Sequence, residues 1–183
     1  MKPILFSDDM VRAILSGRKT QTRRPLKPQP DDDAKIMIGE VGSSKGVAYI
    51  GDSTSGGYVT RVVSPYGKVG DLLWVREAFT LTVPNEKPMY RATWKNPDGI
   101  KWTSSIHMPR WASRITLEIT DIRIERVQEI TEEEAISEGF FLDDGVSEVY
   151  CFSEAWDSLY AKKGLGWYAN PWVWVLTFRR VEG

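Results

Sequence analysis

One short segment of the chain carries side chains that could act together on a ligand. Residues 17–24 have the sequence Gly-Arg-Lys-Thr-Gln-Thr-Arg-Arg, so that Gly17, Lys19, Thr22 and Arg24 follow the spacing GxKxxTxR. Glycine permits a sharp exit from a helix, and an extended chain beyond it would place Thr22 and Arg24 on one side. An amine, a hydroxyl and a guanidinium could then meet, and such groups can activate a nucleophile or hold a phosphate.

The charges of the chain fall into two blocks of opposite sign. The total is nearly balanced, with 24 Lys and Arg against 25 Asp and Glu, so it gives no general attraction to polyanions or membranes. Residues 1–30 nevertheless hold seven cations against two carboxylates, and residues 129–158 hold ten carboxylates and no Lys or Arg. If the blocks face one another, they form a basic cleft with a carboxylate on its rim. If they lie apart, they are solvated faces.

Hydrophobic spacing and capping signals indicate the helices that must position these groups. A first helix is predicted before Gly17, which ends it. Thr131 and Glu134 form a capping box, and Gly139 lies just past the end of the short helix that follows them. A third helix is predicted over residues 153–163.

Alternation of apolar and polar residues indicates a sheet with one buried face. Strands at regular intervals, three short helices and the lack of βαβ alternation predict one α+β domain over residues 1–183. The expected architecture is a small β-barrel of mixed or antiparallel strands. Residues 25–58 are rich in Pro, Gly and Ser and form an excursion, in which we expect an ordered ribbon at 46–50 and a mobile tip. The predicted strands are residues 4–6, 70–76, 88–94, 113–127 and 172–180.

Composition excludes several kinds of site. Cys151 and His107 are each the only residue of their type, so neither an internal disulfide nor a zinc site built on several cysteines can form. We expect no metal and no cofactor. His107 could be a lone general base but is more simply a loop contact, and Cys151 is more simply buried packing. No apolar stretch approaches the roughly 20 residues that cross a bilayer, so we expect a cytoplasmic protein without a membrane partner.

Three segments, in this order along the chain, resemble the ASCH domain, a PUA-like β-barrel. They are the GxKxxTxR segment, the strand Gly-Asp-Leu-Leu-Trp-Val-Arg-Glu at 70–77 and the helix Ile-Thr-Glu-Glu-Glu-Ala-Ile-Ser-Glu-Gly at 130–139. The likeness is to the larger form found in phages and prophages. It extends to Trp-Ala-Ser-Arg at 111–114 and Asn-Pro-Trp-Val-Trp-Val at 170–175. The resemblance implies a cleft, floored by the barrel, that takes RNA or a modified nucleoside or nucleotide.

Members of this family differ in activity. Small bacterial relatives are amidohydrolases that deacetylate acetylated cytidine with the lysine and threonine of the motif and a glutamate of the capped helix. At the matching positions this chain has Lys19, Thr22 and Glu138. Another relative is a ribonuclease, and eukaryotic relatives resemble RNA-binding modules, so the resemblance implies an amidohydrolase, a ribonuclease or a non-catalytic RNA-binding module. The chain differs from the small amidohydrolases by additions at 25–58 and 95–112.

The amidohydrolase chemistry is physically feasible with these three groups. In one scheme Lys19 takes the proton of Thr22, whose hydroxyl attacks the amide carbonyl, and Glu138 orients the lysine or protonates the leaving amine. In the other, Glu138 takes a proton from water and Lys19 stays charged against the oxyanion. The sequence leaves both schemes open. In the simpler interpretation, Thr22 is a turn hydroxyl, Lys19 is a surface charge and Glu138 is a solvated helix carboxylate.

Further side chains could bind the substrate. Guanidinium groups can hold a phosphate, and they lower the pKa of a neighbouring lysine. A tryptophan can stack on a base, although Trp74 is more simply a core residue, and Glu77 is more simply the ion-pair partner of Arg76. The candidate substrate-binding residues are Arg18, Arg23, Arg24, Trp74 and Glu77.

Overall fold

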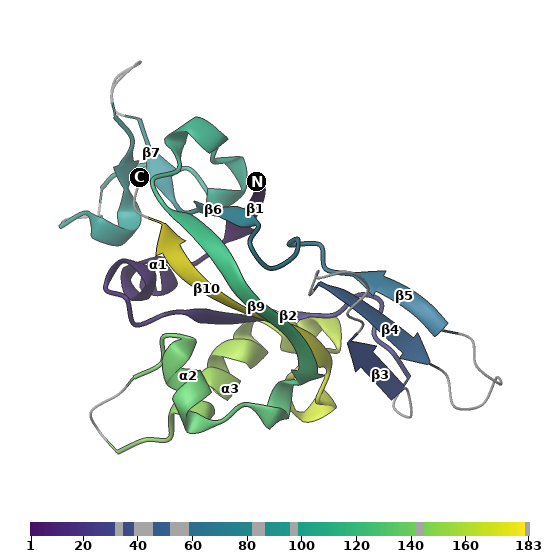
Figure 1. Ribbon diagram of the computed structural model, residues 1–183. Coiled ribbons are helices and arrows are strands. Elements are labelled where there is room, and N and C mark those ends of the chain that lie inside the picture. Colours follow the sequence, from purple (N-terminus) through teal and green to yellow (C-terminus); the bar gives the residue numbers. More distant parts are fainter. Residues whose placement is uncertain are drawn as a thin grey trace.

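A five-stranded sheet organises the molecule. The computed structural model describes residues 1–31, 35–38, 46–51, 59–81, 87–95, 99–141 and 145–181. The strands of the sheet have the order β1-β6-β9-β10-β2, and only β1 and β6 run parallel (Figure 1). Their bounds are β1 Lys2–Leu5, β2 Gln21–Pro25, β6 Leu72–Arg76, β9 Thr116–Arg126 and β10 Trp172–Val181.

The two longest strands, β9 and β10, curve the sheet. Their register shifts between Thr177 and Phe178, and such an irregularity bends a strand and increases its twist. Among the described strands the sheet does not close, so the α+β class is confirmed whereas the predicted closed barrel is not shown. The two edge strands, β1 and β2, are linked by a side chain rather than by backbone pairing. Nη2 of Arg24 on β2 donates a hydrogen bond to the carbonyl of Leu5 on β1 at 2.8 Å.

Three α-helices accompany the sheet. Helix α1, Asp8–Leu15, ends before Gly17, whose φ of +77° suits glycine. Helix α2, Glu132–Ser137, has the predicted capping box. Helix α3, Glu148–Tyr160, begins five residues before the predicted start, because Ser147 caps it by accepting a hydrogen bond from the Tyr150 amide, and Glu132 of α2 accepts another from the Val149 amide.

The remaining strands form two small sheets. Residues β3 Lys35–Ile38, β4 Val47–Gly51 and β5 Val59–Val63 make an antiparallel sheet, which confirms the ribbon expected at 46–50. The tip expected to be mobile lies outside the described residues. Strands β7 Phe79–Thr80 and β8 Met89–Tyr90 form a short pair.

The strand predicted at 88–94 is wrong beyond Tyr90. There the chain turns into a 3₁₀ helix, η1 Arg91–Thr93, because it packs on α1, where Nη1 of Arg12 donates to the Ala92 carbonyl at 2.9 Å. Further 3₁₀ turns are η2 Ser105–His107, η3 Arg110–Ala112, η4 Val127–Glu129, η5 Ala161–Lys163 and η6 Trp167–Ala169.

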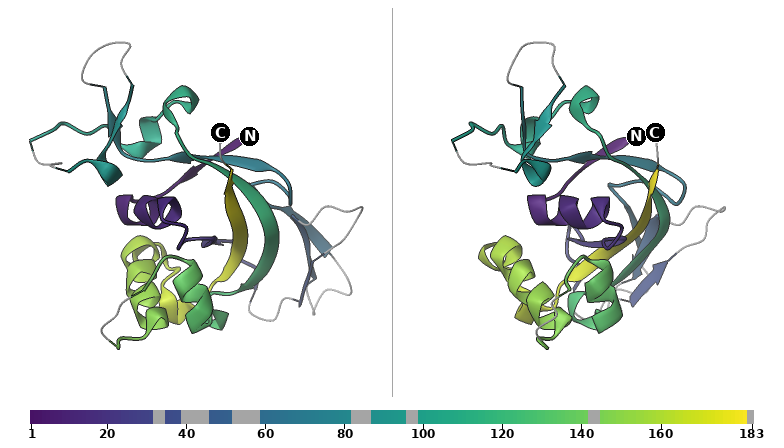
Figure 2. Two further views of the ribbon diagram at one scale, coloured as in Figure 1. Left: turned by 60° about the vertical axis from the view of Figure 1, so that its left-hand side comes forward. Right: turned by 90° about the vertical axis from the view of Figure 1, so that its left-hand side faces the viewer.

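Strand β10 is buried on both faces. Val173 and Val175 pack with side chains of α3, whereas Trp174 and Leu176 join the larger core, which includes Phe6. Figure 2 shows α1 inside the curve of the sheet, with α2 and α3 side by side at one end. Strand β2 pairs with β10, so it also lies between the larger core and the cluster that packs on α3.

No helix in the described part of the chain has both the length and the apolarity needed to cross a bilayer.

Candidate functional site

Lys19 is held between the C-terminal ends of two helices. Its amide donates to the Ala13 carbonyl of α1 at 3.0 Å, and the amide of Thr20 donates to the Ser137 carbonyl of α2 at 2.8 Å. Gly139, with a φ of +100°, lets the helices approach, since a Cβ there would lie 3.1 Å from the Ala13 Cβ and 3.4 Å from the Lys19 Cβ. The glycine after the capped helix therefore sets the position of the lysine.

The amine of Lys19 is buried and fully hydrogen-bonded. Nζ lies 2.7 Å from the Gln21 carbonyl, 2.6 Å from the Glu138 carbonyl and 2.7 Å from Oε2 of Glu138. The side chains of Lys19 and Glu138 are 0% and 3% exposed. Three acceptors match the three N–H groups of an ammonium, whereas a neutral amine would turn its lone pair toward an oxygen. The geometry is therefore that of an ion pair.

Opposing effects act on the pKa of Lys19. Burial lowers this pKa below its usual value of 10.5, because desolvation disfavours the charged form. The carboxylate of Glu138 opposes the effect through its charge and its hydrogen bond, and the charges of Arg24 and Arg23 lower the pKa further. Of the cations expected to act on this lysine, Arg18 does not contribute.

Two oxygens beside this pair remain available. Oε1 of Glu138 is 3.5 Å from Nη1 of Arg23, and it has no hydrogen-bond partner among the described residues. The hydroxyl of Thr22, whose residue is fully buried on β2, also lacks a partner within that part of the chain. Lys19 Nζ bonds the carbonyl just before Thr22, so only one peptide unit separates the ammonium from the threonine backbone. A buried hydroxyl and a buried carboxylate oxygen that lack hydrogen-bond partners within the described residues are groups that a ligand or water can satisfy.

Arg23 joins the sheet to α2 through a network that the sequence did not predict. Its guanidinium pairs with Glu125 of β9 and with Glu134 of α2, the latter at 2.7 Å. Arg123 contacts the same two carboxylates, with Nε 2.8 Å from Glu125. Glu134 thus serves both the capping box and the sheet, and this fixes the helix that ends at Glu138. The sequence signal that could have indicated this network is the pair Arg123 and Glu125, which lie two residues apart and therefore on one face of a strand.

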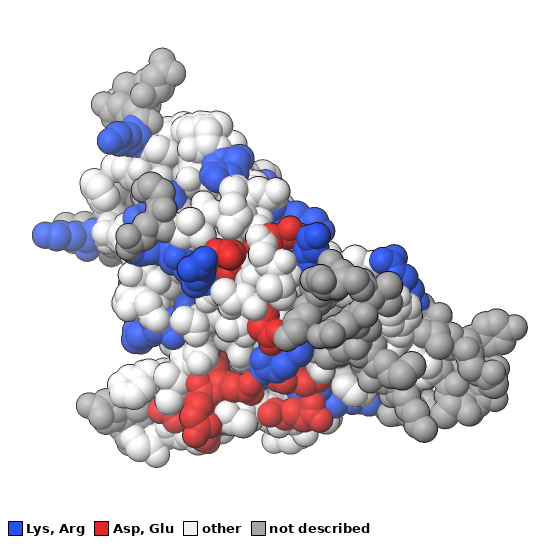
Figure 3. All heavy atoms as spheres, in the orientation of Figure 1, with Lys and Arg blue, Asp and Glu red and all other residues white. Residues whose placement is uncertain are grey.

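The two charge blocks therefore meet, but as interlocked ion pairs. Lys19 and Arg23 of the basic block bind Glu138 and Glu134 of the acidic block. Figure 3 shows the carboxylates gathered over α2 and the neighbouring chain, with basic side chains against them.

A cavity of about 510 Å³ lies beside this cluster. It is lined by Phe6 and Met10 near α1, by Tyr160 of α3, by Tyr66 and by Arg24. A recess of about 20 Å³ shares Met10, Arg24 and Tyr160 with it and reaches Arg23 and Glu138. A space of this size can hold one water molecule.

Arg24 and Phe6 connect the cavity to the lysine. The Arg24 guanidinium carbon is 5.3 Å from the centre of the Phe6 ring, and Lys19 Nζ is 5.6 Å from the same centre. Because side chains alternate along a strand, Arg24 and Thr22 share the face of β2 opposite to Arg23. Strand β2 therefore places Thr22 and Arg24 on one side of the chain, as the sequence analysis predicted.

Comparisons with known proteins leave the family open. No protein-family model matches the chain, and no curated protein matches it. Among solved structures it is similar to protein EF3133 from Enterococcus faecalis, described by family model DUF984, with a TM-score of 0.46 and 12% identity. The match covers 99% of this chain and 81% of that chain. A likeness at this level carries no argument about function.

Three predicted substrate-binding residues lie away from the cluster. Arg18 is exposed and donates to Ser16. Trp74 packs with Phe79, Met108 and Ala112, and the guanidinium of Arg76 lies 5.0 Å from its ring centre. Glu77 is 1% exposed and receives two hydrogen bonds from Arg114, at 2.9 and 2.8 Å. The simpler interpretation of Trp74 fits this packing, and the ion-pair partner of Glu77 is Arg114 rather than Arg76.

Within the described ranges, no group of three or more His, Cys, Asp or Glu side chains is arranged to hold a metal ion.

Proposed function

We propose that this chain is an ASCH-type, PUA-like domain that hydrolyses an acyl-amide on a modified pyrimidine nucleoside. The observation that carries the proposal is the buried Lys19–Glu138 pair, 2.7 Å between Nζ and Oε2, beside a cavity lined by aromatic rings. The curved sheet, with Arg24 bridging its open edge, supports a barrel-like scaffold.

The geometry favours Glu138 as the base. Lys19 donates all three of its N–H groups, so it holds Oε2 in place and leaves Oε1 to accept a proton. Oε1 takes a proton from water in the recess, and the hydroxide adds to the acyl carbon. The carbon–nitrogen bond then breaks, the proton passes from Glu138 to the leaving amine, and a carboxylic acid and the free nucleoside result. Arg24 faces the oxyanion from the cavity wall.

Thr22 remains the alternative nucleophile. Its buried hydroxyl has no partner among the described residues and could be acylated before water completes the hydrolysis. An acyl group trapped on Thr22 and detected by mass spectrometry would favour this route. Full activity of Thr22→Val would instead support direct attack by water.

The proposal is tested by incubating the purified protein with N4-acetylcytidine and following cytidine by chromatography. Glu138→Gln keeps the shape of the side chain and removes the base, so we expect the rate to fall by about 100- to 10,000-fold. Arg179→Ala removes an exposed cation at the far end of β10 and serves as the control. No turnover by the wild type, or full turnover by Glu138→Gln, would refute the hydrolase.

A non-catalytic nucleotide-binding module is the second candidate. It is favoured by the saturation of Lys19, whose three hydrogen bonds suit a structural ion pair as well as a positioned one. The aromatic cavity with Arg24 would then bind a base and its phosphate. Salt-sensitive binding without turnover would select this candidate.

A further inference from the structure

The recess beside Glu138 is bounded mainly by apolar side chains. The residues that line it include Phe140, Phe152, Trp156 and Leu159. The charged side chains that reach it are those of Arg23, Arg24 and Glu138. A buried water needs about two to four polar partners, so the charged groups select the place that a water can take in this recess.

The guanidinium of Arg23 has one donor that its ion pairs do not use. Nη1 donates to Oε1 of Gln21 at 2.8 Å, and Nη2 pairs with Glu125 and with Glu134, the latter at 2.7 Å. Nε carries one hydrogen, and within the described ranges it has no hydrogen-bond partner, although the side chain is 0% exposed. Because the carboxylates neutralise the charge of Arg23, this N–H suits an uncharged polar atom better than an anion.

An acceptor without a partner lies beside this donor. Oε1 of Glu138 is 3.5 Å from Nη1 of Arg23, and it too is buried and lacks a hydrogen-bond partner in the part of the chain that the structure describes. Nε belongs to the same small planar group as Nη1, so a single water can span the separation between Nε and Oε1. A water both accepts and donates hydrogen bonds, and one molecule in the recess therefore satisfies both atoms.

We propose that Arg23 is a positioning residue, which holds the hydrolytic water between its Nε–H group and Oε1 of Glu138. The inference rests on the proposed function and adds a residue to which the GxKxxTxR spacing gives no role. The bond from Nε occupies one lone pair of the water, and the bond to Oε1 occupies one hydrogen, so the second lone pair is free to attack. The water loses a proton to Oε1 while its oxygen forms the new bond to the acyl carbon. The carbon–nitrogen bond then breaks, and the proton passes from Oε1 to the leaving amine.

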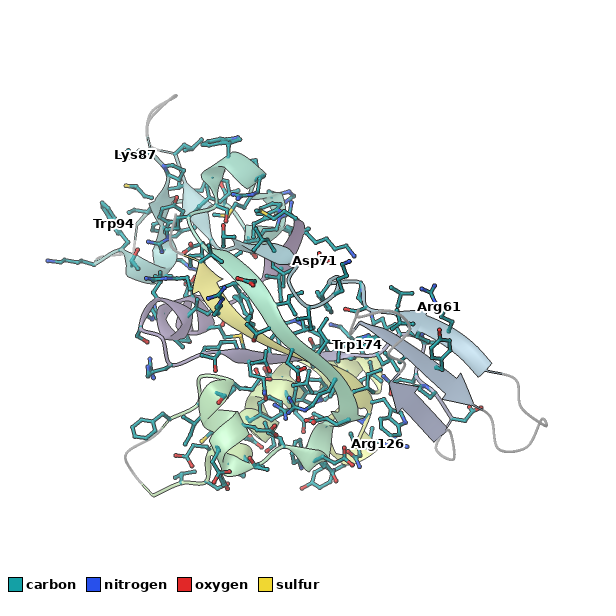
Figure 4. All side chains as sticks on the ribbon, viewed as in Figure 1. Arg61, Asp71, Lys87, Trp94, Arg126 and Trp174 are labelled. Atoms are coloured by element: carbon teal, nitrogen blue, oxygen red, sulfur yellow. The ribbon has the colours of Figure 1, made fainter. Side chains whose placement is uncertain are left out.

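The first test measures kcat and KM of Arg23→Lys with N4-acetylcytidine. Lysine keeps a cation for Glu134 but removes the Nε donor, so we expect kcat to fall by about 10- to 100-fold with KM unchanged. Arg123→Lys is the matched control and should keep the wild-type kcat, because Arg123 pairs with the same two carboxylates but does not line the recess. Arg61→Lys, on β5 in the three-stranded sheet (Figure 4), controls for the substitution itself. An unchanged kcat in Arg23→Lys, or an equal loss in Arg123→Lys, overturns the positioning role while the hydrolase stands.

The second test locates the water without relying on turnover. A crystal structure of the wild type, at a resolution that shows ordered water, should place one water about 2.7–3.2 Å from both Nε of Arg23 and Oε1 of Glu138. If N4-acetylcytidine is not hydrolysed, the proposed function fails, and the electron density in the recess still decides whether the water site exists. An empty recess, or a water bonded to only one of the two atoms, overturns the inference.

Discussion

Breaking the Lys19–Glu138 pair from one side should cost a large part of the stability of the domain, because it leaves a buried charge without its partner. Both side chains are buried, at 0% and 3% exposure, so solvent does not screen them. Removing one partner of such a pair costs about 3–5 kcal/mol. Lys19→Met should lie at the lower end of that range, because Arg23, 3.5 Å from Glu138, remains as a second cation. Glu138→Gln leaves the ammonium with uncharged acceptors only.

The double variant decides whether the pair is coupled. We expect Lys19→Met/Glu138→Gln to be less destabilised than the sum of the two single variants by about 1–3 kcal/mol. For a domain of this size each single change should lower Tm by about 6–20 °C, at about 2–4 °C per kcal/mol. Urea unfolding followed by tryptophan fluorescence and by circular dichroism measures all four proteins. Single effects below about 1 kcal/mol, or strict additivity, would refute the buried ion pair.

Three further predictions follow from the same contacts. Because burial lowers the pKa of Lys19 below 10.5, the unfolded state binds this proton more tightly than the folded state does. The stability of the wild type relative to Lys19→Met should therefore rise with pH, up to about 10.5. Urea unfolding at several pH values measures this difference, and a difference that does not change with pH contradicts the prediction. Gly139→Ala should destabilise by about 1–3 kcal/mol from strain and crowding, whereas Gly17→Ala, with nothing within 4 Å, should suffer strain alone, and thermal unfolding compares them. Glu77→Gln should lower stability by about 1–3 kcal/mol through its bonds to Arg114 but leave kcat/KM for acetylcytidine unchanged, and a selective loss of activity would restore Glu77 to the substrate site.

Local signals in the sequence predicted the elements that they directly encode. The capping box of Thr131 and Glu134 and the glycines at 17 and 139 bound their helices correctly, since each acts within a few residues. The start of α3 was missed although Ser147 is a local cap, because the prediction took the later Ser153 as the start of the helix. The strand at 88–94 was cut short because contacts with α1 outweigh its alternation.

The sequence indicated the Lys19–Glu138 pair but not the aromatic residues that line the neighbouring cavity. The sequence placed Lys19 and Glu138 together only through the resemblance, and the structure brings their side chains to 2.7 Å. Tyr66 and Tyr160 gave no signal, because isolated tyrosines in a loop and at a helix end have no spacing that marks a cavity. Trp74 gave a false signal, since its strand segment carries the resemblance while its ring packs in a separate cluster.

The meeting of the two charge blocks also determines which cations can bind a ligand. A count along the sequence treats Arg23 and Arg24 alike, but side chains alternate on a strand, so they leave β2 on opposite faces, although both reach the small recess beside Glu138. Arg23 is neutralised by Glu125 and Glu134, and it serves to fix α2 against the sheet. Arg24 instead bonds a backbone carbonyl, which leaves its charge uncompensated by that contact, and it lines the cavity. The basic block thus contributes to a ligand site through the alternation of β2 and not through its net charge.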